Sequence, residues 1–560
     1  MAENVLKFDA SAKAYKKLAD KRLDEDDLEG ALSLLLEAKG KTKYLLSIYY
    51  DIAEIYYEMG LYDYSLRYWF RCLDRAPKYE YEDIYNGIGA CYYSLNNIAA
   101  ATYYFNQQLL VSKDGTLYLD DDVLDTIAGM TDAKRNDFKV IYPPQAVDYG
   151  ETMRRGKALM VHGESAAARE LFASVPEGAP DYENAQLEIA VAEFLEGDVD
   201  GGIARSQAIY ERNEHSVFAI CNLASMYKYK GSDTMSGLYF SKLKEEDAVT
   251  EDDMYKIATS CMEHKKYARA AQCFKTMLAE KPYDMQLMFL YGISLYNSGD
   301  FAAAKETFGR ILRITEVNPA ALSYYRRADA ALEGGVKNFR PLPNFYRPFD
   351  DDETENTKKL SQYLKNRSEK VLSKAMKDPK FWDLIDWSFS ASDKEVRRCS
   401  CYLLALCDSR RAEDYLLDKL LDPTLSDDMK GYICELLVLR DFDKTVGVVI
   451  SNVYKKVDFY ALNIDWSGKG DLFMGAYALC VARCVVTGDY DMRKIYDAAL
   501  SVYFSDTDGN GVKAASENAV AALIFIRSGA EKLLSVEECA EIFGCGEDEL
   551  KKLLSVTESE

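Results

Sequence analysis

The chain has 560 residues, of which 48% are hydrophobic, so it can bury large cores and is not a globally disordered protein. Asp and Glu outnumber Lys and Arg by 92 to 69, and the resulting net charge of −23 repels phosphate backbones. This charge disfavours nucleic acid as the main partner, whereas it would attract basic peptides or proteins.

The same sequence gives no sign of export or membrane insertion. No secretory pattern opens the chain, and no run of apolar residues is long enough to span a bilayer. The 13 cysteines lie singly inside apolar, helix-like runs, which is typical of free thiols in a reducing compartment. We therefore expect a cytoplasmic protein.

Small residues recur at a nearly constant spacing along the first part of the chain. They lie in the middle of apolar segments at Ala31, Ser65, Ala101, Ala168, Gly202, Ser236, Ala270 and Ala304. The successive intervals are 34, 36, 67, 34, 34, 34 and 34 residues. Since 67 is close to two intervals, one unit between Ala101 and Ala168 has lost the pattern. The spacing predicts a helical repeat.

The second unit shows the internal pattern of the repeat. Its first helix carries an apolar stripe at Tyr49, Ile52, Ala53 and Tyr56. Gly60 then ends this helix, and Pro77 stops the next one. Between them, the small Ser65 lets the two helix backbones approach, and Trp69 fills the groove beside it.

On these residues the chain resembles the tetratricopeptide repeat family, whose unit has a similar length and pattern. The seventh unit carries that pattern as Met254, Ile257, Ala258, Cys261, Ala270, Phe274, Met277 and Pro282. The resemblance covers residues 12–332 and implies an all-α fold, a right-handed superhelical solenoid. It also implies that the first helix of each unit lines a concave groove.

The interruptions of the repeat predict the domain organisation. Residues 1–111 form a first block of three repeats, 112–148 a degenerate repeat and connector, and 149–333 a second block of five repeats with a capping helix. A proline-rich and acidic linker follows at 334–356, and its aromatic residues predict that it lies against a surface. Residues 357–560 are expected to form an all-α C-terminal region.

The family's groove positions fall on chemically different residues in the two blocks. In the first block they include Tyr50, Glu54, Tyr57, Asn86 and Tyr93, which are tyrosine-rich and acidic. In the second block they include the mostly apolar residues Leu187, Phe194, Tyr255, Met262, Phe289 and Tyr296. Many of the 42 tyrosines could equally pack in the core of the repeat. An apolar second groove would also permit self-association or docking of the C-terminal region.

One specialised function of the family is disfavoured. Its carboxylate-clamp members hold a free C-terminus with lysine and asparagine side chains. Here Lys16 is followed by Asp20 where asparagine is needed, and Glu54 would repel a carboxylate.

Two patterns in the C-terminal region have alternative interpretations. The stretch from Ser392, with a capping box to Glu395, resembles the first half of a HEAT-type repeat, although a generic helical hairpin fits as well. Residues 535–554 resemble a helix-turn-helix with Gly544 at the turn. Its second helix begins with Glu547, Asp548 and Glu549, which disfavours DNA binding.

A calcium-type loop follows the pattern D-x-[DN]-x-[DN]-G-x₅-E. Its oxygen ligands would be Asp506, Asp508, Asn510, the Val512 carbonyl and Glu517. Lys513 departs from the family pattern and the chain holds no second loop of this kind, so an acidic turn between helices is the alternative.

Histidine, cysteine and serine form no arrangement typical of catalysis, so we expect a protein that is not an enzyme. The sequence predicts a cytosolic adaptor or scaffold that binds a protein or peptide in the solenoid groove. The alternative is a regulatory protein whose C-terminal region binds calcium or, with less support, nucleic acid. No cofactor other than calcium is expected.

Overall fold

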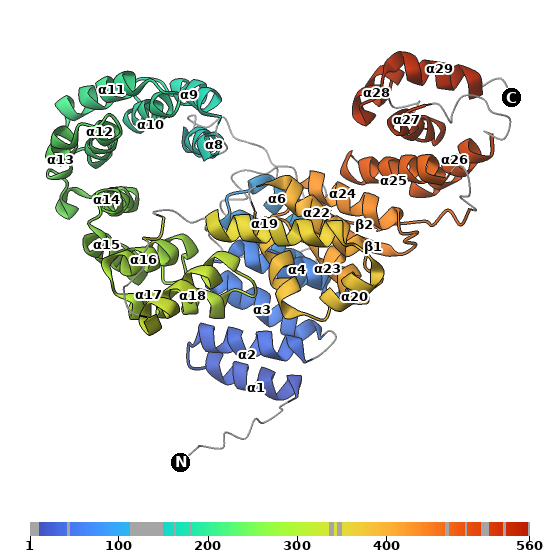
Figure 1. Cartoon of the computed structure of the whole chain (residues 1–560), viewed down its shortest axis with the longest axis horizontal. Coiled ribbons are helices and arrows are strands. Elements are labelled where there is room, and N and C mark those ends of the chain that lie inside the picture. Colours follow the sequence, from blue (N-terminus) through green and yellow to red (C-terminus); the bar gives the residue numbers. More distant parts are fainter. Residues whose placement is uncertain are drawn as a thin grey trace. The chain divides into compact units, whose positions relative to one another are not determined.

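The computed structural model describes residues 11–41, 45–111, 149–161, 164–179, 181–334, 341–343, 350–391, 393–464, 470–487, 490–505, 515–529 and 534–557. Within these residues the fold is almost entirely helical, as the sequence predicts, and falls into two compact units (Figure 1). The first unit joins the N-terminal helices to the C-terminal region, and the second unit contains the helices between them.

The first unit starts with three antiparallel helix pairs. They are α1 (Ala12–Leu23), α2 (Leu28–Gly40), α3 (Leu46–Glu58), α4 (Tyr62–Arg75), α5 (Tyr81–Ser94) and α6 (Ile98–Val111). Its C-terminal part continues with α19 (Asp350–Lys365), α20 (Glu369–Ala375), α21 (Pro379–Ser390), α22 (Lys394–Ala405), α23 (Arg410–Leu420) and α24 (Asp427–Val438). A hairpin of β1 (Thr445–Ile450) and β2 (Val453–Asp458) precedes α25 (Gly470–Thr487), α26 (Met492–Ser505), α27 (Glu517–Arg527), α28 (Val536–Phe543) and α29 (Glu547–Thr557).

The second unit is a curved row of helix pairs (Figure 1). Its helices are α8 (Tyr149–Val161), α9 (Ser165–Ala173), α10 (Tyr182–Leu195), α11 (Val199–Arg212), α12 (Val217–Tyr229) and α13 (Asp233–Phe240). They continue as α14 (Glu251–Glu263), α15 (Tyr267–Glu280), α16 (Met285–Ser298), α17 (Phe301–Ile314) and α18 (Pro319–Gly334). Helices that are neighbours in sequence pack on one another, as expected for a solenoid, except that α14 packs on α12 rather than on α13.

A glycine and an aromatic ring lock the two helices of several units together. The glycine lies in the first helix and the ring in the second, in the pairs Gly89–Phe105, Gly156–Phe172 and Gly292–Phe308. A Cβ atom on these glycines would lie only 2.4, 2.3 and 2.7 Å from the ring. Because only hydrogen fits there, the glycine permits the close helix approach.

Two serines at the small-residue positions of the repeat also hold a helix pair together, by hydrogen bonds. Ser65 Oγ donates a hydrogen bond of 2.7 Å to the Ala53 carbonyl, and Ser236 Oγ donates one of 2.7 Å to the Ala224 carbonyl. Both serines are buried and both bonds join the second helix of a unit to its first helix. The buried hydroxyl is therefore satisfied by the same contact that holds the helix pair.

The C-terminal region contains one element that the expectation of a wholly helical region missed. β1 and β2 pair in antiparallel register, from Thr445 opposite Asp458 to Ile450 opposite Val453. The β-branched residues of β1 favour a strand, and Ser451 and Asn452 adopt φ of 49° and 67° in the two-residue turn.

Two predicted boundaries also differ from the structure. The acidic run assigned to the linker belongs to the first turn of α19, so the helix begins inside the predicted linker. Ser392 lies outside the described residues, and the N-cap of α22 is Asp393, whose carboxylate accepts from the Glu395 N–H at 2.9 Å.

Ion pairs fasten the C-terminal region to the second helix of the second repeat. On α4, Arg67 Nε donates to Asp422 at 3.0 Å. One turn later, Arg71 forms a two-pronged pair with Asp418 on α23, with its Nε 2.7 Å from the carboxylate. Burial raises the pKa of Asp422, but Arg67, Lys419 and Thr424 outweigh it and lower that pKa to about 2.

The turn of the β-hairpin lies against the same repeats. Tyr104 on α6 donates from its hydroxyl to the Asn452 carbonyl at 2.8 Å and accepts from the Tyr454 N–H at 2.9 Å. The Tyr454 hydroxyl in turn bonds to Asp74 on α4 at 3.1 Å. The C-terminal region therefore engages the second-helix face of the first block, through α4 and α6.

Lys430 is expected to make stability depend on pH. This side chain is 1% exposed and donates to the Val449 carbonyl at 2.6 Å. Burial lowers its pKa from 10.5 to about 8, although Asp427 acts in the opposite direction. Between these two pH values the unfolded chain binds the extra proton, so the contribution of Lys430 to stability should rise with pH by about 3 kcal/mol. Buried cysteines such as Cys434, whose pKa burial raises to about 12, act in the opposite direction in this range, so variants are compared at each pH. In urea denaturation, the stability difference between wild type and Lys430→Met should change with pH by this amount, whereas the difference for the exposed control Lys444→Met should not change.

Candidate protein-binding grooves

The first helices of the first block carry the predicted tyrosine-rich groove. Tyr50, Glu54 and Tyr57 lie on α3, and Asn86 and Tyr93 lie on α5. Glu54 is exposed, the Tyr57 side chain has an exposed fraction of 36%, and the other three are partly buried. This face of the first block thus offers both acidic and phenolic groups to a partner.

Carboxylates dominate the charge of this face. Partial loss of solvent around its carboxylate raises the pKa of Glu54, the charges of Asp51, Glu58 and Asp83 raise it further, and Lys16 lowers it in part. Burial also raises the pKa of Asp51, an effect that its ion pair with Lys16 offsets in part. Because the carboxylates repel one another, an added cation would be stabilised here.

Aromatic and amide groups fix the shape of the same face. The Tyr50 ring meets Trp69 edge-on with centroids 4.6 Å apart. The Tyr57 and Ser94 hydroxyls lie 3.3 Å apart and link α3 to α5. Within the described residues, the buried Oδ1 of Asn86 has no hydrogen-bond partner.

The predicted groove residues of the second block are mostly covered. Their side-chain exposure is at most 6% for Leu187, Met262, Phe289 and Tyr296. Phe289 packs near the Tyr324 ring, with centroids 6.0 Å apart, so α18 accounts for part of its cover. Phe194 and Tyr255 are partly buried, and the Tyr255 hydroxyl accepts from Gln286 at 2.6 Å.

Sequence reasoning missed a contact on α16. The Asn297 side chain donates to the Leu342 carbonyl at 2.9 Å and accepts from the Leu342 N–H at 2.8 Å. Leu342 belongs to the predicted linker and is only 2% exposed. The sequence did contain a signal for this contact, since Leu342 has a proline on each side. Flanking prolines favour an extended segment without internal hydrogen bonds, whose backbone groups are free to bond elsewhere.

The calcium-type loop is described only at its last ligand. Asp506, Asp508, Asn510 and Val512 lie outside the described residues. Glu517 is the first residue of α27, and its carboxylate lies over Gly475 of α25, where burial raises its pKa. Calcium binding stays a prediction from the sequence. Among the residues that the structure describes, no group of three or more His, Cys, Asp or Glu side chains could hold a metal ion.

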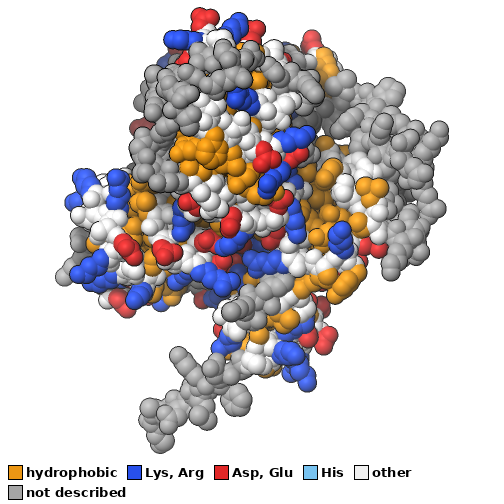
Figure 2. Space-filling model, turned by 90° about the vertical axis from the view of Figure 1, so that its right-hand side faces the viewer, with side chains coloured by type: hydrophobic (Ala, Val, Ile, Leu, Met, Phe, Trp, Pro, Cys, Tyr) orange, Lys and Arg blue, Asp and Glu red, His pale blue; other side chains and the backbone are white. Residues whose placement is uncertain are grey.

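The C-terminal helices show the turn glycine and the buried residues that the helix-turn-helix resemblance implies. Gly544 ends α28 with φ of 65°, and Ala540 and Leu550 are buried. The first turn of α29 carries three acids, and Lys551 pairs with Glu547. On the face drawn in Figure 2, basic and acidic side chains are interspersed, so its coloured part presents no extended basic area.

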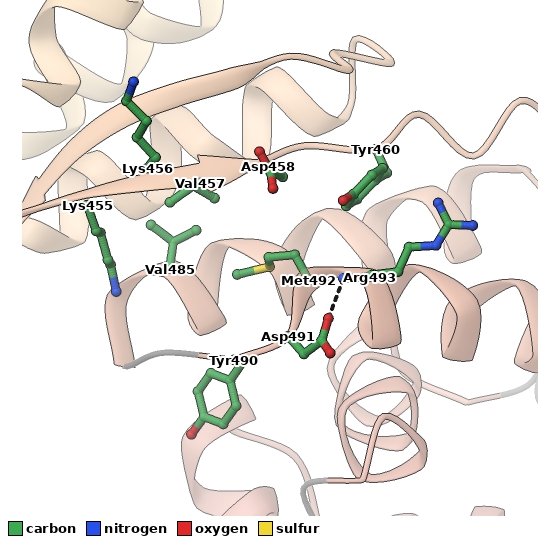
Figure 3. Close-up of a pocket in the computed structure, with 10 residues that line it drawn as sticks. All are labelled: Lys455, Lys456, Val457, Asp458, Tyr460, Val485, Tyr490, Asp491, Met492 and Arg493. Carbon is green, nitrogen blue, oxygen red and sulfur yellow. Dashed lines mark hydrogen bonds between the residues drawn. The ribbon is translucent and has the colours of Figure 1, made fainter. Parts of the chain in front are cut away.

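A small hollow lies between β2 and α26, with a volume of about 270 Å³ (Figure 3). Lys455 and Lys456 point to opposite sides of the strand, as alternation along a strand requires. Asp491 accepts from the Arg493 N–H at 3.1 Å and so caps α26. The charged groups of this hollow do not converge on one point, and they define no reaction.

The rows of packed helix pairs define a helical-repeat solenoid. Residues 255–319 match the family model described as tetratricopeptide repeat. The glycine, serine and aromatic contacts described above recur in helix pairs outside these residues, at Ser65, Gly89, Gly156 and Ser236. The chain thus contains tetratricopeptide repeats within an all-α solenoid. No curated protein sequence matches it.

Several solved structures are similar in fold. A tetratricopeptide repeat protein from Parabacteroides merdae has 14% identity, with 54% of this chain and 98% of that one covered and a TM-score of 0.23. Yeast Tom70 has 12% identity, covering 90% and 98% of the two chains, with a TM-score of 0.27. The TPR2AB domain of yeast Sti1 in complex with pHSP90 has 13% identity, covering 57% and 98%, with a TM-score of 0.19.

None of the described helices combines the length and the apolar character that a bilayer span requires.

Proposed function

We propose that the protein is a non-catalytic cytosolic adaptor that binds a Lys- and Arg-rich segment of another protein in the groove of its first block. The observation that supports this most is the acidic face around Glu54, beside the exposed Tyr57. A tetratricopeptide solenoid supports protein binding in general, and the charge and ring content of this groove suggest the class of segment.

The arrangement of the first unit favours the first-helix face as the binding face. α4 and α6 already contact the C-terminal region through Arg67, Arg71 and Tyr104. α3 and α5 carry the carboxylates, phenols and amide described above. Since Asp51 is already paired with Lys16, a cationic side chain entering here would relieve the mutual repulsion of Glu54, Glu58 and Asp83. The tyrosines would supply apolar contact area.

A direct binding measurement tests this proposal. The probe is a short extended peptide in which Lys and Arg alternate with Ala and Leu, labelled with a fluorophore. We expect it to bind the full chain, with an affinity that falls as salt screens the charges. Glu54→Lys should weaken binding by about tenfold, or about 1.4 kcal/mol, because it replaces an attraction with a repulsion.

Matched controls separate the groove from the overall negative charge. Glu280→Lys makes the same charge change on an exposed position of α15 and should leave the affinity unchanged. The same peptide with Asp and Glu in place of Lys and Arg should not bind. Equal loss of affinity in both variants, or equal binding of both peptides, would contradict the proposal.

A further inference from the structure

The contact between Asn297 and Leu342 has the features of peptide recognition. Both backbone groups of Leu342 bond to one carboxamide, at 2.8 and 2.9 Å. Carboxamide side chains offer a donor and an acceptor side by side, so one of them can pair with the N–H and the C=O of an extended residue. Asn297 therefore recognises the peptide backbone through its N–H and C=O groups, which are the groups that a neighbouring β-strand would bond.

The chemistry of the segment matches this side chain. Within Pro341-Leu342-Pro343, Leu342 alone carries a backbone N–H, because proline has none. Pro343 also restricts Leu342 to extended conformations. The segment therefore reaches Asn297 with little conformational entropy left to lose, and its single donor is satisfied by the Asn297 oxygen.

The leucine side chain is held as well as the backbone. Leu342 is 2% exposed, whereas Pro341 at the edge of the contact is exposed. On α16, Asn297 follows the predicted groove position Tyr296, which is 6% exposed, and Ile293 one turn earlier is 0% exposed. An enclosed apolar side chain together with two backbone bonds constitutes a built binding site, and both partners belong to the second unit.

We propose that Asn297 is the backbone-reading residue of a second peptide site, which the chain's own Pro341-Leu342-Pro343 segment occupies. Its ligand class is an extended peptide with an apolar residue between two prolines, and such a peptide binds by displacing the resident segment. The site is separate from the acidic groove of the first block and does not depend on the proposed function of that groove.

Competition in the full chain tests the proposal. The probe is a labelled peptide that spans residues 338–346 of this chain, added in trans. A tethered segment competes at a high effective concentration, so the wild-type chain should bind the probe weakly. Leu342→Ser frees the site and should strengthen probe binding by at least about tenfold. Adding Asn297→Ala to Leu342→Ser should abolish the gain, whereas adding Ser298→Ala, at an exposed neighbour, should keep it.

Hydrogen exchange provides a second measurement that needs no probe. The Leu342 amide is the single exchangeable backbone site of its tripeptide, and its bond to Asn297 protects it. In otherwise wild-type chain, Asn297→Ala should raise its exchange rate by about tenfold or more, and Ser298→Ala should not change it. Equal probe binding by the wild-type and Leu342→Ser chains, or unchanged exchange in Asn297→Ala, would overturn the proposal.

Discussion

Replacing Phe308 with alanine is expected to lower the free energy of unfolding of the second unit by about 3–5 kcal/mol. The Phe308 side chain is fully buried, lies against Gly292, and has the Tyr324 ring centroid 5.4 Å from its own. Its loss leaves a cavity between α16, α17 and α18 that rigid helices cannot fill. Urea denaturation of the full chain, followed by circular dichroism, measures the change.

The matched control for this prediction is Phe504→Ala, since Phe504 lies on α26 with 59% of its side chain exposed. It should change stability by less than about 1 kcal/mol. In a solenoid each repeat contacts its neighbours, so hydrogen exchange should also rise first in α16–α18. A stability loss equal in the two variants would show that Phe308 does not lock its repeat.

Replacing Asp422 with alanine is expected to destabilise the first unit by about 3 kcal/mol or more. Asp422 is 9% exposed, and its removal leaves Arg67 and Lys419 without the carboxylate that compensates their charges. Its pKa of about 2 lies below the ordinary value of 3.8, so its contribution is present at neutral pH and is lost as pH falls from about 4 toward 2. Denaturation at pH 7 and at low pH measures both effects.

Two further variants distinguish the ion pair from a general loss of charge. Asp414→Ala removes an exposed acid from the same region and should cost less than about 1 kcal/mol. Arg67→Ala combined with Asp422→Ala should be less destabilising than the two single changes together, because no arginine is left unpaired. Strict additivity of the two changes would contradict the role assigned to this pair.

The repeat could be predicted from the sequence because its physics is local. Ser65 and Ser236 hold their helix pairs by contacts within one unit, and the same is true of Gly292 and Phe308. Such contacts impose a spacing that periodicity reveals. The pairing of Arg67 with Asp422 spans most of the chain and has no periodic signal. The packing of the first block against the C-terminal region therefore could not be predicted from the sequence.

The candidate site was predictable to a smaller extent. Family positions predict which residues face a groove, and on α3 they predict Glu54 and Tyr57, which are both exposed. Family positions do not show which other parts of the chain cover a groove. Met262 and Tyr296 were therefore expected at the surface, but the structure shows that both are buried. Asn297 was missed because a single asparagine on a helix gives no signal until Leu342 is placed beside it.

Site-specific photo-crosslinking tests the central claim most directly. A photoreactive phenylalanine analogue would replace Tyr57 in the first groove or, as a control, the exposed Phe504 on α26. In full-length chain expressed in cells, the account predicts a crosslink from position 57 to a Lys- and Arg-rich segment of another protein. This crosslink should be lost with Glu54→Lys and should not form from position 504. The same crosslinked segments from both positions, or a crosslink insensitive to Glu54→Lys, would contradict the account.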